Sequence, residues 1–205
     1  MLALDTGVGA SACLLMPDGA TASVSMTTPR AHSKELLPML QGLLDEQGLT
    51  WQDIQSFAVS IGPGSFTGLR VACATIAGIN ASLQKPVFSL SSLGVTAKQT
   101  DSEETFWAIE DARSGLVYAA EFAADECVTT AECLTWQDFL NLKPTSYITL
   151  SDVPVKIQGA VALPVQHSRE QALIKAAQAI STTQPSALWV EPLYLQVSQA
   201  EKNLA

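Results

Sequence analysis

Short apolar runs separated by turn residues dominate the first hundred residues. Five of these runs have the length and composition of β-strands: residues 2–5, 11–17, 20–27, 56–61 and 87–90. Asp18-Gly19 lies between the second and third runs and is typical of a two-residue hairpin turn. Helical periodicity covers residues 33–47 and 67–83, and a short helix is predicted over 91–99.

The order of these elements predicts the fold class. Three strands joined by tight turns, followed by a helix that crosses to a further strand, are how the ribonuclease-H-like fold begins. Polar residues at 100–105 mark a domain boundary, after which residues 106–112 and 116–123 again have strand character. We therefore predict an α/β protein of two domains with mixed sheets and flanking helices. Residues 1–102 form a ribonuclease-H-like domain, and residues 103–205 form a smaller, degenerate domain of related fold.

The second half carries one convincing helix, over residues 168–181. Ser168 is a good N-cap residue and Gln171 follows three positions later, so the two make a capping box. Residues 131–136 are a further strand candidate, whereas residues 140–165 match no pattern that we can interpret.

Composition and charge limit the classes of function. Hydrophobic residues make up 47% of the 205 residues, which is enough for a sizeable core. The formal net charge of −9 disfavours direct contact with nucleic acid, whose phosphates repel an acidic surface. No apolar run approaches the roughly 20 residues that cross a bilayer, and the stretch MLALDTGVGA lacks the basic segment of a signal peptide. We therefore expect a cytoplasmic protein without membrane contact.

The stretch GPGSFTGLR, residues 62–70, joins a predicted strand to a predicted helix through a glycine-rich turn. This order is found in loops that bind phosphate, but such a loop usually carries a lysine before its Ser or Thr. Here Phe66 precedes Thr67, and Ser65 or Thr67 can instead cap the helix. The turn therefore either presses the helix against its sheet or begins a helix that contacts another protein.

Six motifs give the chain a family resemblance. They are ALDT, SKELLPML, GPGSFTGLR, KPVFSLSSL, EDARSGLVY and EPLYLQ, in that order. With these motifs the chain resembles the bacterial tRNA threonylcarbamoyladenosine biosynthesis factors TsaB, also called YeaZ, densely over residues 1–120 and again at 191–196. The resemblance implies an actin-like ATPase (ASKHA) fold and a relation to TsaD, the metal-dependent catalytic subunit of the same pathway. The chain departs from the family at Gln196, where an arginine is usual.

The resemblance also implies a function. A protein of this family is a non-catalytic subunit that binds and supports the TsaD-like catalytic subunit. Their complex forms N6-threonylcarbamoyladenosine beside the anticodon of tRNAs that read codons starting with A. A TsaE-like ATPase is implied as a third component. A homodimer is a further assembly, formed through the helices at 33–47 and 67–84 that would also contact the catalytic subunit. The chain itself is not expected to bind tRNA. The alternative is a stand-alone actin-like ATPase or kinase.

The residues themselves argue against that alternative. An actin-like ATPase needs an acidic residue with glycines or hydroxyls in its first phosphate loop, and Asp5, Thr6 and Gly7 are the candidates. Its second loop needs glycines after an acidic residue, because side chains would block the approach of the backbone to phosphate. Residues 111–114 read DARS instead. We therefore expect no cofactor in the isolated chain, with ATP bound only weakly or within the complex. Asp5 is then a strand-end residue that accepts backbone N–H bonds in a turn.

A metal site and a catalytic centre are not expected either. The resemblance aligns the two metal-binding histidines of TsaD with Ser92 and Thr96, and hydroxyls bind iron or zinc poorly compared with imidazole. The two histidines of this chain, His32 and His167, are far apart in sequence. We therefore predict that the chain has no catalytic residue.

The helices at 33–47 and 67–84 carry more apolar surface than packing on one sheet requires. Apolar residues of the first helix spread over a wide arc, and the second helix is rich in small residues that let another helix come close. The excess is covered either by the chain's own second half or by another chain, and the resemblance favours another chain. The predicted partner interface consists of Leu36, Leu37, Met39, Leu40, Leu43, Leu44, Thr67, Arg70, Val71, Ala74, Ala77 and Gly78.

Overall fold

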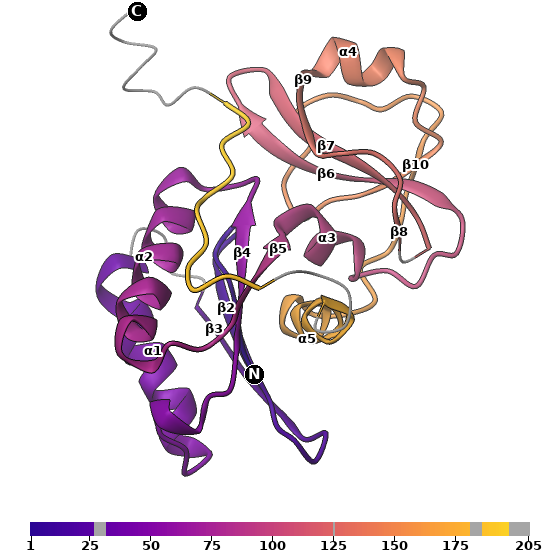
Figure 1. The fold of residues 1–205 in the computed structure, drawn as a ribbon. Helices are drawn as coiled ribbons and strands as arrows, with labels where there is room; N and C mark the ends of the chain where they lie inside the picture. The colour runs from indigo at the N-terminus through magenta and orange to yellow at the C-terminus, as the bar shows by residue number, and fades with distance from the viewer. Residues whose placement is uncertain (27–31, 125, 181–185, 197–205) are drawn as a thin grey trace, which may run out of the picture.

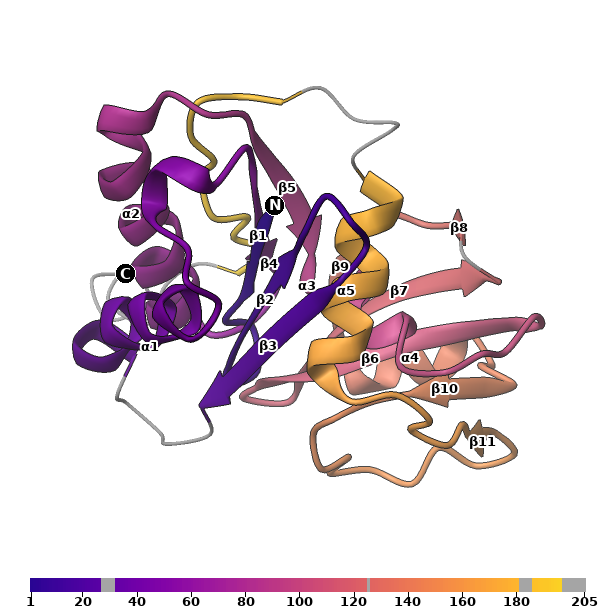
Figure 2. The ribbon, with the colours of Figure 1, turned by 90° about the horizontal axis from the view of Figure 1, so that it is seen from below.

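The computed structural model describes residues 1–26, 32–124, 126–180 and 186–196. Within these residues the chain forms two mixed sheets, with helices between them and on their outer faces (Figure 1). Figure 2 shows the helix α5 (Arg169–Ile180) lying between the two sheets. The predicted α/β class, with mixed sheets and flanking helices, is confirmed.

The first sheet has the strand order β3-β2-β1-β4-β5. Its strands are β1 (Leu2–Asp5), β2 (Ala10–Leu15), β3 (Thr21–Met26), β4 (Phe57–Gly62) and β5 (Val87–Ser91). β2 is antiparallel to β1 and β3, whereas β4 is parallel to both β1 and β5. Three hairpin-linked strands followed by parallel crossovers are the arrangement that the strand and helix order predicted.

Two helices cover one face of the first sheet, α1 (His32–Glu46) and α2 (Phe66–Leu83), with the short 3-10 helix η1 (Trp51–Asp53) between them in sequence. Their apolar residues share one core with those of the strands. Among the described residues, α2 alone has the length and mean hydropathy, 1.2, of a membrane span. Its residues Ala72 and Ile76 are nevertheless buried in the core of the sheet, which is the usual place of such a helix in a folded domain.

The helix α5 covers the opposite face of the first sheet. Ala172, Leu173 and Ala177 are fully buried there in one cluster with Ala3 and Ala58. A helix from the second half of the chain thus completes the core of the first half. The division of the chain into domains at residue 102 stays a prediction.

Side-chain caps begin α2 and α5 where the sequence predicted them. The Gly68 N–H donates to Ser65 Oγ at 3.2 Å, so Ser65 is the N-cap of α2. The Ser168 N–H donates to Gln171 Oε1 at 2.9 Å and the Gln171 N–H donates to Ser168 Oγ at 3.2 Å. The predicted capping box is therefore confirmed.

The second sheet has the order β11-β10-β6-β7-β8, and β9 also pairs with β7. Its strands are β6 (Thr105–Arg113), β7 (Leu116–Ala123), β8 (Glu126–Cys127), β9 (Glu132–Thr135), β10 (Ser146–Ile148) and β11 (Val161–Ala162). The helix α3 (Ser92–Ala97) packs on one face through Leu93, and α4 (Trp136–Asn141) packs on the other through Phe139. The elements α4, β8, β10 and β11 had no counterpart in the sequence prediction.

Candidate functional site

A buried polar cluster lies where the two sheets meet α5. Its charged members are Asp5 at the end of β1, Glu110 in β6, and Arg169, the first residue of α5. The exposed fraction is 1% for Asp5, 3% for Glu110 and 9% for the Arg169 side chain. Charges buried this deeply need partners, so their contacts determine what the site can do.

The Arg169 guanidinium makes five polar contacts, one for each of its N–H donors. Its Nε and Nη2 both lie 2.8 Å from Asp5 Oδ2. Its Nη1 donates to the Thr96 hydroxyl at 2.6 Å and to Gln99 Oε1 at 3.3 Å. Its Nη2 also donates to the Ser92 carbonyl at 3.2 Å. The cation is therefore fully surrounded by acceptors from the chain itself.

Thr96 links this guanidinium to the second carboxylate, because its Oγ1 also lies 3.0 Å from Glu110 Oε1. Burial raises the pKa of Glu110, while the Arg169 charge and hydrogen bonds from Thr96 and Ser151 oppose the rise. Both buried carboxylates thus depend on Arg169 for electrostatic compensation.

Two glycine turns touch each other beside Asp5. The Gly7 N–H donates to Asp5 Oδ1 at 3.3 Å, as expected of a strand-end aspartate, and the Ser65 N–H donates to the Gly7 carbonyl at 3.1 Å. A Cβ on Gly64 would lie 2.7 Å from the Gly7 Cα, and a Cβ on Gly7 would lie 2.6 Å from Ser92 Oγ. The two turns therefore pack backbone against backbone, and they leave no room for a phosphate between them.

The residues aligned with ligand-binding positions do not fit a nucleotide or a metal. Thr6 is 0% exposed, and its Oγ1 lacks a hydrogen-bond partner among the described residues. Ser92 Oγ bonds Ser60 Oγ at 2.7 Å, and Thr96 is engaged by Arg169. In the described part of the chain no three His, Cys, Asp or Glu side chains are grouped as metal ligands. A metal ion beside this guanidinium would also be repelled by it.

His167 takes no part in the cluster. Its Nε2 lies 2.7 Å from the Asp101 carboxylate and 2.7 Å from Lys175 Nζ on α5. Hydrogen bonds from Lys175 and His167 lower the pKa of Asp101. The side chain of His32 lies outside the described residues. The contacts of His167 and the ion pair between Lys175 and Asp101 therefore hold the turn before α5 in place.

The second-loop candidate forms a hairpin between β6 and β7. The Arg113 N–H donates to Asp111 Oδ1 at 3.3 Å, and both Arg113 and Ser114 are exposed. Gln196 Nε2 donates to the Ala112 carbonyl at 2.9 Å. The residue that departs from the family pattern therefore contacts the chain itself.

The predicted partner interface divides into a buried and an exposed part. Four leucines of α1 are 0–3% exposed and lie in the core: Leu36, Leu40, Leu43 and Leu44. The prediction that these four side chains meet a partner is wrong, because the first sheet and α2 already cover them. The exposed positions are Leu37, Thr67, Arg70, Ala74 and Gly78, and the half-buried ones are Met39, Val71 and Ala77. A contact of these eight positions with a partner stays a prediction.

The C-terminal segment, residues 186–196, runs along α2 and the first sheet (Figure 1). The Leu193 N–H donates to the Ile61 carbonyl at 2.7 Å, and Asn80 Nδ2 donates to the Leu188 carbonyl at 2.9 Å. The sequence prediction left this segment without an assigned position. Part of the surface beside α2 is thus covered by the chain itself.

Tyr194 of this segment completes an aromatic stack at the start of α2. Its ring lies on that of Phe66 with 4.3 Å between the centroids. The Arg70 guanidinium lies 4.0 Å from the Phe66 centroid and remains exposed. The motif EPLYLQ carried the only sequence signal for this contact, and nothing in the motif identifies its partners on α2.

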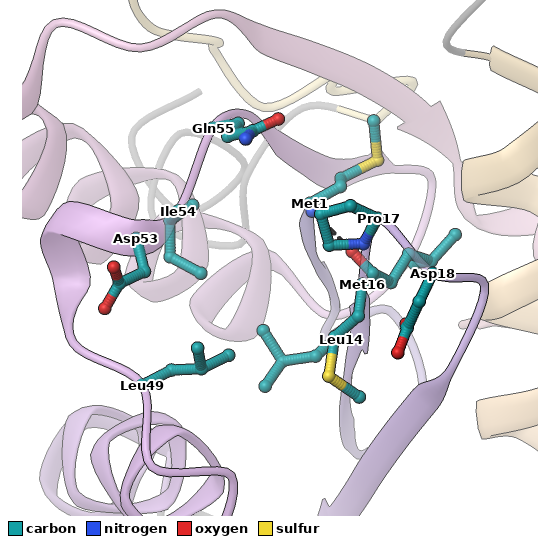
Figure 3. A pocket seen from close by; sticks show the side chains of 10 residues that line it. Met1, Leu14, Met16, Pro17, Asp18, Leu49, Asp53, Ile54 and Gln55 are labelled. Atoms are coloured by element: carbon teal, nitrogen blue, oxygen red, sulfur yellow. Dashed lines mark hydrogen bonds between the residues drawn. The ribbon is translucent and has the colours of Figure 1, made fainter.

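A separate hollow lies at the far end of the first sheet, between the turn after β2 and the segment before β4 (Figure 3). Leu14 and Ile54 line it, together with the carboxylates of Asp18 and Asp53. Both carboxylates already accept backbone N–H bonds, Asp18 from Ala20 and Asp53 from Thr50. The polar lining of the hollow also includes the side chain of Gln55.

A family model described as TsaD, tRNA N6-adenosine threonylcarbamoyltransferase, matches residues 24–142, which is more than half of the chain. The chain belongs to this family. The TsaB protein of Escherichia coli K12 is 34% identical over 129 residues, which are 62% of this chain and 56% of the relative. That of Haemophilus influenzae is 29% identical over 145 residues, which are 69% of this chain and 61% of the relative. The chain thus spans about three fifths of the length of these curated relatives.

Two solved structures share the fold over most of the chain. An uncharacterized Pseudomonas aeruginosa protein with similarity to the peptidase YeaZ superimposes with a TM-score of 0.75 at 26% identity, covering 95% of this chain and 98% of that one. YeaZ from Pseudomonas aeruginosa superimposes with a TM-score of 0.70 at 27% identity, with the same coverage. The resemblance to TsaB, or YeaZ, that the six motifs indicated is therefore confirmed.

Proposed function

We propose that the chain is a non-catalytic subunit of tRNA threonylcarbamoyladenosine biosynthesis that binds and supports a TsaD-like catalytic subunit. Curated relatives in two bacteria carry this pathway in their names. The pairing of Asp5 with Arg169 carries the proposal of a non-catalytic role, because it leaves the acidic residue of the first loop without a free charge. The complex forms N6-threonylcarbamoyladenosine beside the anticodon of tRNAs that read codons starting with A.

We propose that the TsaD-like subunit binds the exposed strip of α2, which consists of Thr67, Arg70, Ala74 and Gly78, together with the neighbouring helix α1. Ala74 and Gly78 are exposed there, and a Cβ on Gly78 would meet nothing within 4 Å. Such small side chains let the backbone of a partner approach closely. Leu37, which is 50% exposed, supplies an apolar contact from α1. The helix pair thus offers both close approach and apolar area.

Five further assignments belong to the same proposal. A TsaE-like ATPase is the third component, and the homodimer uses the same helices as the complex. The net charge of −9 supports binding of tRNA by the complex rather than by this chain alone. The isolated chain holds no cofactor, and its place is the cytoplasm, where tRNA is modified.

Size-exclusion chromatography of the chain with and without a TsaD-like subunit tests the docking surface. Ala74→Asp places a charge on the exposed strip, so we expect co-elution to be lost while the chain stays folded. Thr130→Asp adds the same charge to an exposed position before β9, and this control should still co-elute. A variant at Ala74 that binds with undiminished affinity contradicts the proposed surface.

Isothermal titration with ATP and magnesium tests the alternative, a stand-alone actin-like ATPase or kinase. We expect no binding to the isolated chain in the micromolar range, because the glycine turns at Gly7 and Gly64 fill the space beside Asp5. Micromolar binding would support the alternative instead.

A further inference from the structure

Arg169 occupies a position on α5 that is electrostatically poor for a cation. It is the first residue of the helix, where unpaired N–H groups produce a partial positive charge. The capping box of Ser168 and Gln171 makes this helix start definite. A buried arginine is stable there only if nearby negative charge outweighs the helix dipole. Asp5 of the first sheet supplies that charge directly, and the carboxyl group of Glu110 in the second sheet is linked to the guanidinium through the Thr96 hydroxyl.

The hydrogen-bond acceptors around the guanidinium are all oxygens. The carboxylate of Asp5, the hydroxyl of Thr96, the amide oxygen of Gln99 and the carbonyl of Ser92 lie 2.6–3.3 Å from its nitrogens. Carboxylate, carbonyl and hydroxyl oxygens are the donors that hard divalent cations prefer. The chain has therefore built an oxygen-lined cation position and filled it with its own side chain.

We propose that Arg169 is a built-in cation that takes the place of a metal ion between the two sheets and joins them through α5 without any bound ligand. This explains why the residues here do not fit a metal. The charge that a metal would supply is already present. It follows that the arrangement of the two sheets does not respond to metal ions, and that removing the guanidinium opens the position to a divalent cation.

Thermal unfolding of the full chain with and without MnCl₂ tests the proposal. We expect the wild-type Tm to be unchanged by Mn²⁺. In Arg169→Ala the Tm should fall by roughly 10 °C, because Asp5 and Glu110 lose their compensating charge. Millimolar Mn²⁺ should restore part of this loss. Lys175→Ala removes another cation from α5, whose side chain is 40% exposed, and this control should not respond to Mn²⁺.

A double variant separates charge compensation from packing. Asp5→Asn combined with Arg169→Ala removes both partners, so it should be more stable than Arg169→Ala in the absence of metal and should not respond to Mn²⁺. If Arg169→Ala alone does not fold, Arg169→Lys provides the reference, and it should fold without a response to Mn²⁺.

Three results would overturn the proposal. The first is that Arg169→Ala has the same Tm as the wild type. The second is that the double variant is no more stable than Arg169→Ala. The third is that Mn²⁺ changes the Tm of the wild-type chain and that Asp5→Asn abolishes this change. None of these readouts involves the TsaD-like subunit, so they are independent of the proposed docking surface.

Discussion

The Nε of Arg70 donates a hydrogen bond to the Tyr194 hydroxyl at 2.7 Å, across 124 positions of the sequence. The bond holds the Tyr194 ring on that of Phe66, and it lies next to the backbone bond from Leu193 to Ile61. The C-terminal segment is therefore attached to α2 by a side-chain stack and to β4 by a main-chain bond.

Tyr194→Ala removes both the stack and the hydrogen bond. An aromatic pair contributes about 0.5–1.5 kcal/mol beyond buried area, so the Leu193 amide should exchange with solvent roughly three to ten times faster. Hydrogen exchange followed by mass spectrometry or NMR measures this rate. Tyr194→Phe keeps the stack but loses the hydrogen bond, so its exchange rate should lie between those of the wild type and Tyr194→Ala. Unchanged exchange in Tyr194→Ala would show that the stack does not hold the segment.

Leu40 and Leu37 lie on the same helix in opposite environments, 0% and 50% exposed. Leu40→Ala leaves a cavity in the core and should lower the free energy of unfolding by about 2–5 kcal/mol. Leu37→Ala should change that free energy by less than about 0.5 kcal/mol. It should nevertheless weaken binding of the TsaD-like subunit. Urea unfolding and size-exclusion chromatography measure the two effects, and equal losses of stability would contradict the assignment of core and surface.

Gly64 needs to be glycine because of its contact with Gly7. Gly64→Ala forces a Cβ to 2.7 Å from the Gly7 Cα at a φ of 155°, so we expect a loss of at least about 2 kcal/mol in the free energy of unfolding. Gly42→Ala is the matched control, since a Cβ on Gly42 in α1 would meet nothing within 4 Å. That substitution should stabilise the chain by about 0.5–1 kcal/mol. Urea titration of both variants measures the difference, and a tolerated Gly64→Ala would disprove the close packing of the two turns.

Glu110 has a pKa raised by burial, so the folded chain holds its proton more tightly than the unfolded chain does. The stability contributed by the protonated side chain is present at low pH and is lost as pH rises from the ordinary glutamate value of 4.5 through the folded-state pKa. Glu110→Gln stays neutral throughout this range. Its free energy of unfolding should therefore decrease less with rising pH than that of the wild type. Parallel pH profiles from urea unfolding would argue against a raised pKa.

Local patterns in the sequence were enough for much of the fold. Strand-length apolar runs and the Asp18-Gly19 turn predicted β1 to β5, because alternation and turn chemistry depend on neighbouring residues. The capping box at Ser168 and Gln171 was likewise visible, since its two hydrogen bonds span three residues. Short elements such as β10 and α4 were missed, because three to six residues carry too little periodicity to be recognised.

The sequence by itself determined the family, the first sheet with its flanking helices, and the strand-end role of Asp5. Only the tertiary structure decided that Arg169 pairs with Asp5 from 164 positions away, and that Leu40 lies in the core rather than on the surface. The physical reason is that burial and charge pairing depend on which surfaces meet. An amphipathic helix shows which of its faces is apolar, but the sheet and the second helix that cover that face come from distant parts of the chain.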